Sequence, residues 1–205
     1  MAEVPSLASR DALDLTPPPF AEGLCDWSRS DGTHGSPSYE SGEGVRIARG
    51  DGDFGTCLEI CKLEPVQRLR YMGELPFRAG ARVELRARIK AVRGPLPAAR
   101  IAAWPGGLGG KGLRDLPGAG PIVTLVGHGA VAELRAVIGR SAGPGVDLVW
   151  DARALYAHVG LDLIGPCGGV VRIEDIQARE LPGVDAGQAL PGFGAADADG
   201  AAAAP

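Results

Sequence analysis

The sequence has no long apolar run. No segment approaches the roughly 20 apolar residues that a membrane-spanning helix needs, which argues against a protein that crosses a bilayer by helices. The first fifteen residues, MAEVPSLASRDALDL, show neither the basic start nor the apolar stretch of a secretory signal peptide. We therefore expect synthesis in the cytoplasm, followed by retention there or by release on lysis rather than secretion.

The net charge is small and histidine is scarce. The formal net charge is −4 at pH 7, so there is no electrostatic reason to expect binding to nucleic acid or to an anionic membrane. Only three histidines occur, and no nucleophile or carboxylate is marked beside them as a catalytic partner: His34, His128 and His158. The sequence therefore predicts no catalytic histidine.

The four cysteines do not have the spacing of a zinc site. Cys57 and Cys61 lie in a strand-like run, separated by about 13 Å at the rise of a strand, which is too far for a disulfide. We expect all four to be free thiols: Cys25, Cys57, Cys61 and Cys167.

Glycine and proline, in contrast, are abundant. The 32 glycines and 17 prolines make up nearly a quarter of the chain, beside 45% hydrophobic residues. This mixture is typical of many short strands joined by tight turns. The clearest strand follows Arg78-Ala79-Gly80, where apolar residues from Val83 to Ala91 alternate with charged ones from Arg82 to Lys90. One face of that strand is buried and the other solvated, as in an antiparallel sheet.

The stretch from Tyr156 to Leu181 organises the end of the fold. Apolar residues alternate first along 159–163 and then along 171–178, on either side of the turn Gly165-Pro166-Cys167-Gly168-Gly169. The alternation slips by one residue at Glu174-Asp175, which is the pattern that a β-bulge produces. The sequence therefore places two acidic residues at a bulge.

About nine or ten such strands and no convincing helix predict an all-β domain, a two-sheet antiparallel jelly-roll sandwich. We expect residues 122–126 and 131–138 to form a hairpin, 146–150 a strand and 151–156 a short helical turn. The expected core residues are Val83, Leu85, Ile89, Ile101, Leu134, Leu161, Leu163 and Ile173.

Three segments divide the chain. Residues 1–19 form an N-terminal arm that ends in three prolines, residues 20–181 form the sandwich, and residues 182–205 form a flexible Ala/Gly/Pro tail. An arm of this kind either moves freely or docks on a neighbouring chain. Docking predicts a homo-oligomer in which Val4, Leu7, Leu13 and Leu15 are the anchors.

Candidate ligand residues lie beside loops. Sugar binding needs an aromatic ring against the apolar face of a pyranose and polar groups for its hydroxyls. Trp104 opens the Gly-rich segment 105–120, which also contains Lys111 but lacks the Ser/Thr and the helix of a phosphate loop. The candidate carbohydrate site comprises Trp104, Arg114, Asp115, Trp150 and Tyr156. The alternative is that both tryptophans are core residues.

Glu174 and Asp175 are candidates for another role. Their oxygens suit a structural calcium ion, or half of a catalytic acid/base pair. The alternative is that both are ordinary exposed acids at the bulge, with no cofactor bound.

The segment VVRIEDI resembles the V-x-I-D-D-V strand that closes the jelly roll of carbohydrate-binding modules of the xylanase and cellulase type. Trp27 with its following loop, the CLEI run, LRY and ARVELRARIKAV fit the same order, so the resemblance covers roughly residues 20–181. In that family the second acid of the motif helps to hold a structural calcium ion. Asp175 is the matching residue, whereas Glu174 departs from the usual Asp.

The ends of the chain, LDLTPPPFAEGLCDWSRSDGT and GLDLIGPCGGVVRIEDI, also resemble proteins of alphaproteobacterial gene transfer agents, which are phage-like particles with head spikes. That resemblance implies a non-enzymatic spike protein that attaches to a capsid, to cell-surface polysaccharide, or to both. One alternative is a free-standing carbohydrate-binding module. A second is a polysaccharide lyase or hydrolase.

Overall fold

The computed structural model describes residues 15–29, 38–39, 44–52, 54–76, 81–107, 118–139, 142–150 and 154–181. Within these ranges the chain forms fourteen strands and one 3₁₀ turn, η1 (Phe20–Glu22), and no α-helix. No helix in the described part of the chain has the length and hydropathy to cross a membrane. The all-β prediction is confirmed.

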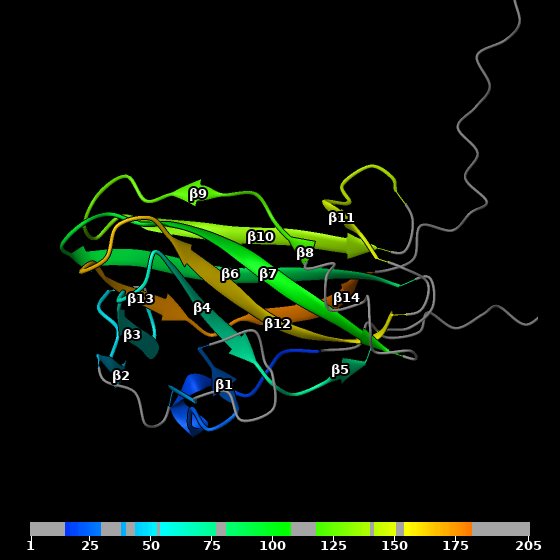
Figure 1. The fold of residues 1–205 in the computed structure, drawn as a ribbon, viewed down its shortest axis with the longest axis horizontal. Helices are drawn as coiled ribbons and strands as arrows, with labels where there is room; N and C mark the ends of the chain where they lie inside the picture. The colour runs from blue at the N-terminus through cyan, green and yellow to red at the C-terminus, as the bar shows by residue number, and fades with distance from the viewer. Residues whose placement is uncertain are drawn as a thin grey trace, which may run out of the picture.

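The strands form two sheets that pack face to face, with β7 and β12 crossing in front of β6 in Figure 1. The first, which we call the β12 sheet, has the order β1-β4-β12-β7-β8. Its strands are β1 (Trp27–Ser28), β4 (Val66–Tyr71), β12 (Ala154–Ile164), β7 (Ala98–Gly107) and β8 (Gly118–Ala119), with β5 (Leu75–Pro76) beside β12 and β9 (Val123–Thr124) beside β7.

The second, which we call the β6 sheet, has the order β11-β10-β6-β13-β3-β2, and β14 also pairs with β6. All its pairings are antiparallel except that of β10 with β11. Its strands are β11 (Leu148–Val149), β10 (Val131–Gly139), β6 (Arg82–Arg93), β13 (Val170–Glu174), β3 (Cys57–Cys61), β2 (Val45–Ala48) and β14 (Gln177–Leu181).

The predicted bulge lies between β13 and β14. Ile173 of β13 is opposite Ile89 of β6, and Gln177 of β14 is opposite Arg86 of β6. The chain therefore advances by four residues from β13 to β14 while β6 advances by three. One extra residue is therefore inserted at the slip that the hydrophobic pattern marks at Glu174-Asp175, as a bulge requires.

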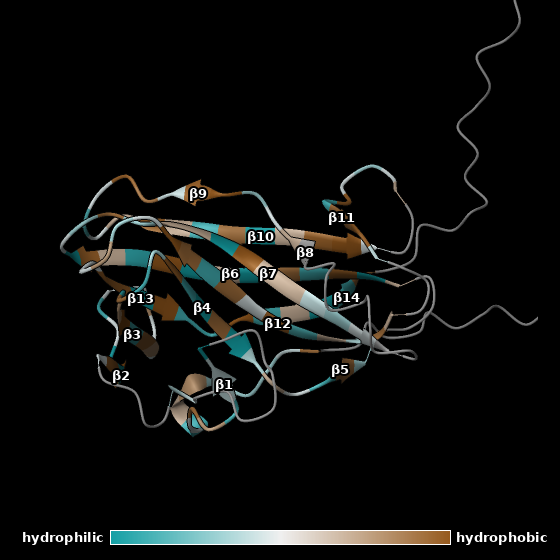
Figure 2. Ribbon diagram, viewed as in Figure 1, coloured by the Kyte–Doolittle hydropathy of each residue, from teal (hydrophilic) through white to brown (hydrophobic). Residues whose placement is uncertain are grey.

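The core between the sheets follows the period-two pattern of the sequence. Apolar and polar segments alternate along the long strands in Figure 2. All eight residues expected in the core are 4% exposed or less: Val83, Leu85, Ile89, Ile101, Leu134, Leu161, Leu163 and Ile173. A core of this size supplies most of the stability of a sandwich, because each such side chain stabilises the fold by about 1.5–3 kcal/mol.

Two local predictions are wrong, and a third strand is shorter than expected. Residues 122–126 and 131–138 form no hairpin, because β9 pairs with β7 in one sheet and β10 pairs with β6 in the other. The segment Gly127-His128-Gly129 instead crosses between the sheets, and the Gly129 N–H donates to the carbonyl of Ala91.

Residues 154–156 belong to β12 rather than to a helical turn, and the rest of that turn, 151–153, lies outside the described residues. The strand expected over 146–150 is restricted to β11.

The sandwich begins before the predicted boundary at residue 20. The Leu15 N–H donates to the Ala178 carbonyl at 2.7 Å, and the Ala178 N–H donates to Thr16 Oγ1 at 3.2 Å. Leu15, expected as an anchor for another chain, is buried in this chain's own core. Residues 1–14 of the arm, with the other three anchors, and residues 182–205 of the tail lie outside the described residues.

Candidate functional site

Each sheet has an inner face in the core and an outer face, because successive strand residues point to opposite sides. We call the outer face of the β12 sheet the β12 face and that of the β6 sheet the β6 face. The polar and charged side chains of the long strands gather on these two faces, so the candidate sites lie there.

Trp104 lies on the β12 face, opposite His158 in the pairing of β7 with β12. Its side chain is nearly covered, with 4% exposure. The guanidinium carbons of Arg68 and Arg70 lie 4.9 and 5.0 Å from the centre of its indole ring. Such cation–π contacts are worth about 0.5–2 kcal/mol each, so Trp104 and the two arginines form one packed unit.

Asp162 fixes two arginines on the same face. It lies opposite Arg68 of β4 and Arg100 of β7, and its own side chain is buried. One carboxylate oxygen accepts from Arg68 Nε at 3.0 Å, and the other accepts from Arg100 Nε and Nη2 at 3.2 and 3.0 Å. Removing one partner of such a buried pair is costly, so the arginines are held in place.

Tyr156 and His158 complete the β12 face. Their rings meet edge to face with centroids 5.5 Å apart, and His158 Nδ1 donates to the Gly73 carbonyl at 3.1 Å. Burial, with the nearby positive charge of Arg70, lowers the pKa of His158, so the ring is neutral at pH 7. Tyr156 lies over Gly106 on β7, where an added Cβ would meet the phenol ring at 2.2 Å.

The β12 face brings together only part of the predicted carbohydrate site. Trp104 and Tyr156 both lie on it, whereas Trp150 is 3% exposed and packs in the main core, as the alternative interpretation has it. Arg114 and Asp115 lie outside the described residues.

The arginines, Asp162 and His158 were missed by the sequence analysis. The signal was present, because Tyr156, His158 and Asp162 alternate with the apolar residues of β12. The alternation does not single out these residues as a site, because every half-buried strand shows it.

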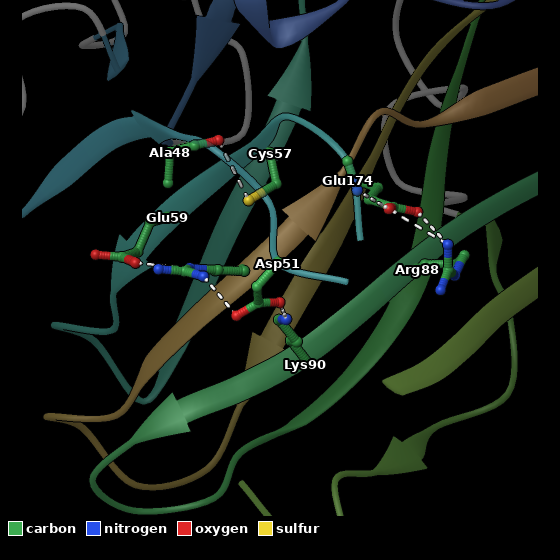
Figure 3. A network of polar contacts seen from close by, with 9 residues as sticks. Ala48, Asp51, Cys57, Glu59, Arg88, Lys90 and Glu174 are labelled. Carbon is green, nitrogen blue, oxygen red and sulfur yellow. Dashed lines mark hydrogen bonds and ion pairs between the residues drawn. The ribbon is translucent and has the colours of Figure 1, made fainter. Parts of the chain in front are cut away.

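The β6 face carries a network of ion pairs, shown in Figure 3. Arg172 donates from Nε to Glu59 at 2.9 Å and from Nη1 to Asp51 at 3.1 Å, and Lys90 pairs with the same Asp51. The loop that carries Asp51 thus folds over β13 and β6, and it brings Phe54 beneath the ammonium of Lys90 at 4.6 Å. This face was expected to be solvated, but the loop leaves Lys90 buried.

Glu84 is the second charged side chain that is buried on this face. Its oxygens accept hydrogen bonds from three arginines on three strands: Arg86, Arg135 and Arg179. Burial raises the pKa of the Glu84 carboxyl, but these hydrogen bonds outweigh it and lower the pKa from 4.5 to about 2. Glu84 is therefore ionised throughout the physiological range.

Glu174 and Asp175 point in different directions from the bulge. Glu174 accepts from Arg88 Nη1 at 3.1 and 3.3 Å and from the Gly55 N–H at 2.7 Å (Figure 3). Asp175 accepts from the Phe20 N–H at 2.8 Å. Burial raises the pKa of Asp175 despite that hydrogen bond, and the negative charges of Glu174 and Glu22 raise it further.

The calcium hypothesis stays a prediction. Calcium takes six to eight oxygen ligands, and the described residues contain no group of three or more Asp, Glu, His or Cys side chains that could hold a metal ion. Asp175 is one carboxylate, whose pKa is raised mainly by burial, whereas the oxygens of Glu174 already accept from Arg88 and Gly55.

The cysteine prediction is confirmed. Cys25 and Cys167 are exposed free thiols, Cys61 is partly buried, and Cys57 is buried with its Sγ 3.7 Å from the Ala48 carbonyl (Figure 3).

No protein-family model matches this chain, and no curated protein is significantly similar to it in sequence. Solved structures are similar in fold. The CBM22-1 xylan-binding domain of Xyn10C from Paenibacillus barcinonensis has a TM-score of 0.55 at 12% identity, over 84% of this chain and 97% of that one. The fold is that of a carbohydrate-binding-module jelly roll. A second such module is the C-terminal family 22 carbohydrate-binding module of Clostridium thermocellum Xyn10B, with a TM-score of 0.52 at 11% identity, over 88% of this chain and 99% of that one.

Proposed function

We propose that this protein is a non-enzymatic adhesion protein that binds polysaccharide on its β12 face. The observation that carries the proposal is the gathering of Tyr156, His158 and Trp104 with fixed arginines on one outer face of a jelly roll. The likeness to xylan-binding domains supports it at the level of fold.

The chemistry of the β12 face suits a sugar. The ring of Tyr156 is partly exposed and offers an apolar surface for a pyranose, beside its hydroxyl. In the neutral ring of His158, Nδ1 donates to the Gly73 carbonyl, so Nε2 is left to accept a hydrogen bond from a sugar hydroxyl. Arg68 and Arg100, held by Asp162, add donors of fixed orientation, so little entropy is lost when a ligand binds.

The two fully buried carboxylates, Asp162 and Glu84, favour binding over catalysis at their own positions on the outer faces. Glycoside hydrolysis needs one carboxylic acid that is protonated when it acts. Both oxygens of Asp162 accept hydrogen bonds from arginines, and the pKa of Glu84 is held at about 2. The alternative of a polysaccharide lyase or hydrolase predicts release of reducing ends from a bound polymer. If none of the polysaccharides that bind releases reducing ends, this result supports the non-enzymatic proposal.

The finer proposal is a head-spike component of a phage-like particle, attached to a capsid as a homo-oligomer and released by lysis. It rests on the resemblance of the two ends of the chain to gene transfer agent proteins. Sedimentation tests it together with co-purification on particles. A symmetric oligomer found on particles supports the spike, whereas a monomer that binds glycans and is never found on particles favours a free-standing module.

The test of the β12 face is Tyr156→Ala, measured by titration of the purified protein with the neutral polysaccharide that binds best in a glycan panel. We expect at least about a ten-fold loss of affinity, equivalent to about 1.4 kcal/mol. Leu155→Ala is the matched control, because Leu155 is the neighbouring exposed side chain on β12. Equal binding by Tyr156→Ala and Leu155→Ala would contradict the proposal.

A further inference from the structure

The arginine cluster around Glu84 exposes much more positive than negative charge. The Glu84 side chain is 3% exposed, whereas the side chains of Arg86, Arg135 and Arg179 are 41%, 46% and 59% exposed. The three arginines come from β6, β10 and β14, which lie side by side in the sheet. One buried carboxylate thus holds three outward-facing guanidinium groups in a row across three strands.

The cluster is also fixed in place. Arg135 Nε lies 2.7 Å from one Glu84 oxygen, and Arg179 Nε and Nη2 lie 2.9 and 2.7 Å from the other. Each guanidinium has five N–H donors, and a carboxylate cannot accept from all fifteen. Arg135 and Arg179, which are 46% and 59% exposed, keep donors available to a ligand, whereas Arg86 also lies 3.6 Å from Glu133. An arginine fork of this kind matches a carboxylate or sulfate group.

A pocket of about 120 Å³ adjoins the cluster at the bulge. It shares Arg86 with the cluster, and its other lining residues are Ala87, Arg88, Glu133, Glu174, Asp175 and Gln177. Donors and acceptors are thus mixed on its walls. That mixture suits hydroxyl groups, because each hydroxyl both donates and accepts.

We infer that the β6 face binds an acidic polysaccharide, with charged groups of the polymer on Arg86, Arg135 and Arg179 and sugar hydroxyls in the adjoining pocket. Carboxylate and sulfate share the required chemistry. This surface lies on the opposite side of the sandwich from the β12 face and does not depend on the function proposed there. The exposed acids Glu133 and Asp51 repel a continuous phosphate backbone but leave room for a polymer whose charges are spaced apart.

The probes are polygalacturonate, its fully methyl-esterified form, dextran sulfate and double-stranded DNA, each titrated into the full-length protein. We expect polygalacturonate, which carries one charge per sugar, to bind at least about ten-fold more tightly than the esterified polymer and than DNA. Added salt should weaken that binding, because exposed charges are screened. The relative affinities of polygalacturonate and dextran sulfate identify the preferred anion. Equal affinity for the esterified polymer, or tighter binding of DNA, would overturn the inference.

The variant is Arg179→Gln, which leaves Glu84 with two arginine partners. Arg46→Gln is the matched control, because Arg46 is also an exposed arginine, paired with Glu59 at 2.7 Å. We expect a loss of about ten-fold or more in acidic-polymer affinity for Arg179→Gln and less than about three-fold for Arg46→Gln. Equal losses would show only a general charge effect and would overturn the site. Arg88→Gln tests the pocket independently, with the same expectation, if Arg179→Gln does not fold.

Discussion

The two outer faces of the sandwich are built from the same devices and differ in what they display. On the β12 face, one buried carboxylate, Asp162, holds two arginines beside the rings of Trp104 and Tyr156. On the β6 face, Glu84 holds three arginines, and the aromatic residue Phe54 is itself buried beneath Lys90. One face thus offers ring surface with polar groups, and the other offers fixed charge.

The difference shows that the inner and outer faces of a sandwich have separate roles. The inward-facing residues of both sheets are committed to a common core, whereas the outward-facing positions are free to differ. A buried carboxylate under arginines is structurally demanding on either face, because its arginines must supply the hydrogen bonds that burial removes. Each face therefore pairs a stabilising ion cluster with side chains available to a ligand.

The largest expected effect comes from the core that the faces share. Leu85 is fully buried on β6, so Leu85→Ala should cost about 2–5 kcal/mol from lost burial and a cavity. Chemical denaturation gives the free energy of unfolding, and binding to both faces should weaken together as the protein unfolds. A loss below about 1 kcal/mol would mean that the inward face of β6 is wrongly assigned.

Acid should destabilise the β6 face through Glu84. The folded protein lowers its pKa from 4.5 to about 2, so its contribution is complete above about pH 4.5 and is lost as pH falls toward 2. Glu84→Gln should cost about 2–3 kcal/mol at pH 7. The cost should shrink between pH 4.5 and 2, as followed by denaturation at each pH. A cost that does not change with pH would contradict the ion-pair explanation.

The described part of the N-terminal arm contributes to stability through Leu15, which is buried in the core. Removing residues 2–14 should leave the sandwich folded and abolish assembly, if the arm joins copies of the chain. Removing residues 2–19 should also cost about 1.5–3 kcal/mol, because Leu15 is buried on β14. Sedimentation of both deletions checks the first effect, and thermal unfolding checks the second. Normal assembly without residues 2–14 would refute the arm's role.

The smallest effect is expected at the bulge. The raised pKa of Asp175 means that its ionised form is disfavoured in the fold, so this carboxyl destabilises the fold at pH 7, and the penalty is relieved as pH falls through the raised pKa toward the ordinary value of 3.8. In chelator at pH 7, Asp175→Asn should match or exceed the wild-type melting temperature, because Asn still accepts from the Phe20 N–H. If calcium binds, added calcium should raise the melting temperature of the wild type only. An unchanged wild-type curve would leave Glu174 and Asp175 as ordinary bulge acids.

Sequence periodicity predicted the core and the bulge because both depend on which residues point inward, and that follows directly from alternation. It failed at 122–138, where two neighbouring strands join different sheets, since alternation does not specify a pairing partner. It also missed the Glu84 cluster. Arg135 and Arg179 lie 51 and 95 residues from Glu84, and a charged residue on a solvated face looks the same in sequence whether it is paired or not.

The most direct test of the two-face account is a crossed titration of wild type, Tyr156→Ala and Arg179→Gln with a neutral and an acidic polysaccharide. The account predicts that Tyr156→Ala loses about ten-fold in affinity for the neutral polymer and keeps the acidic one, while Arg179→Gln shows the reverse. Loss of both polymers by either variant, with melting temperatures unchanged, would contradict two separate binding faces.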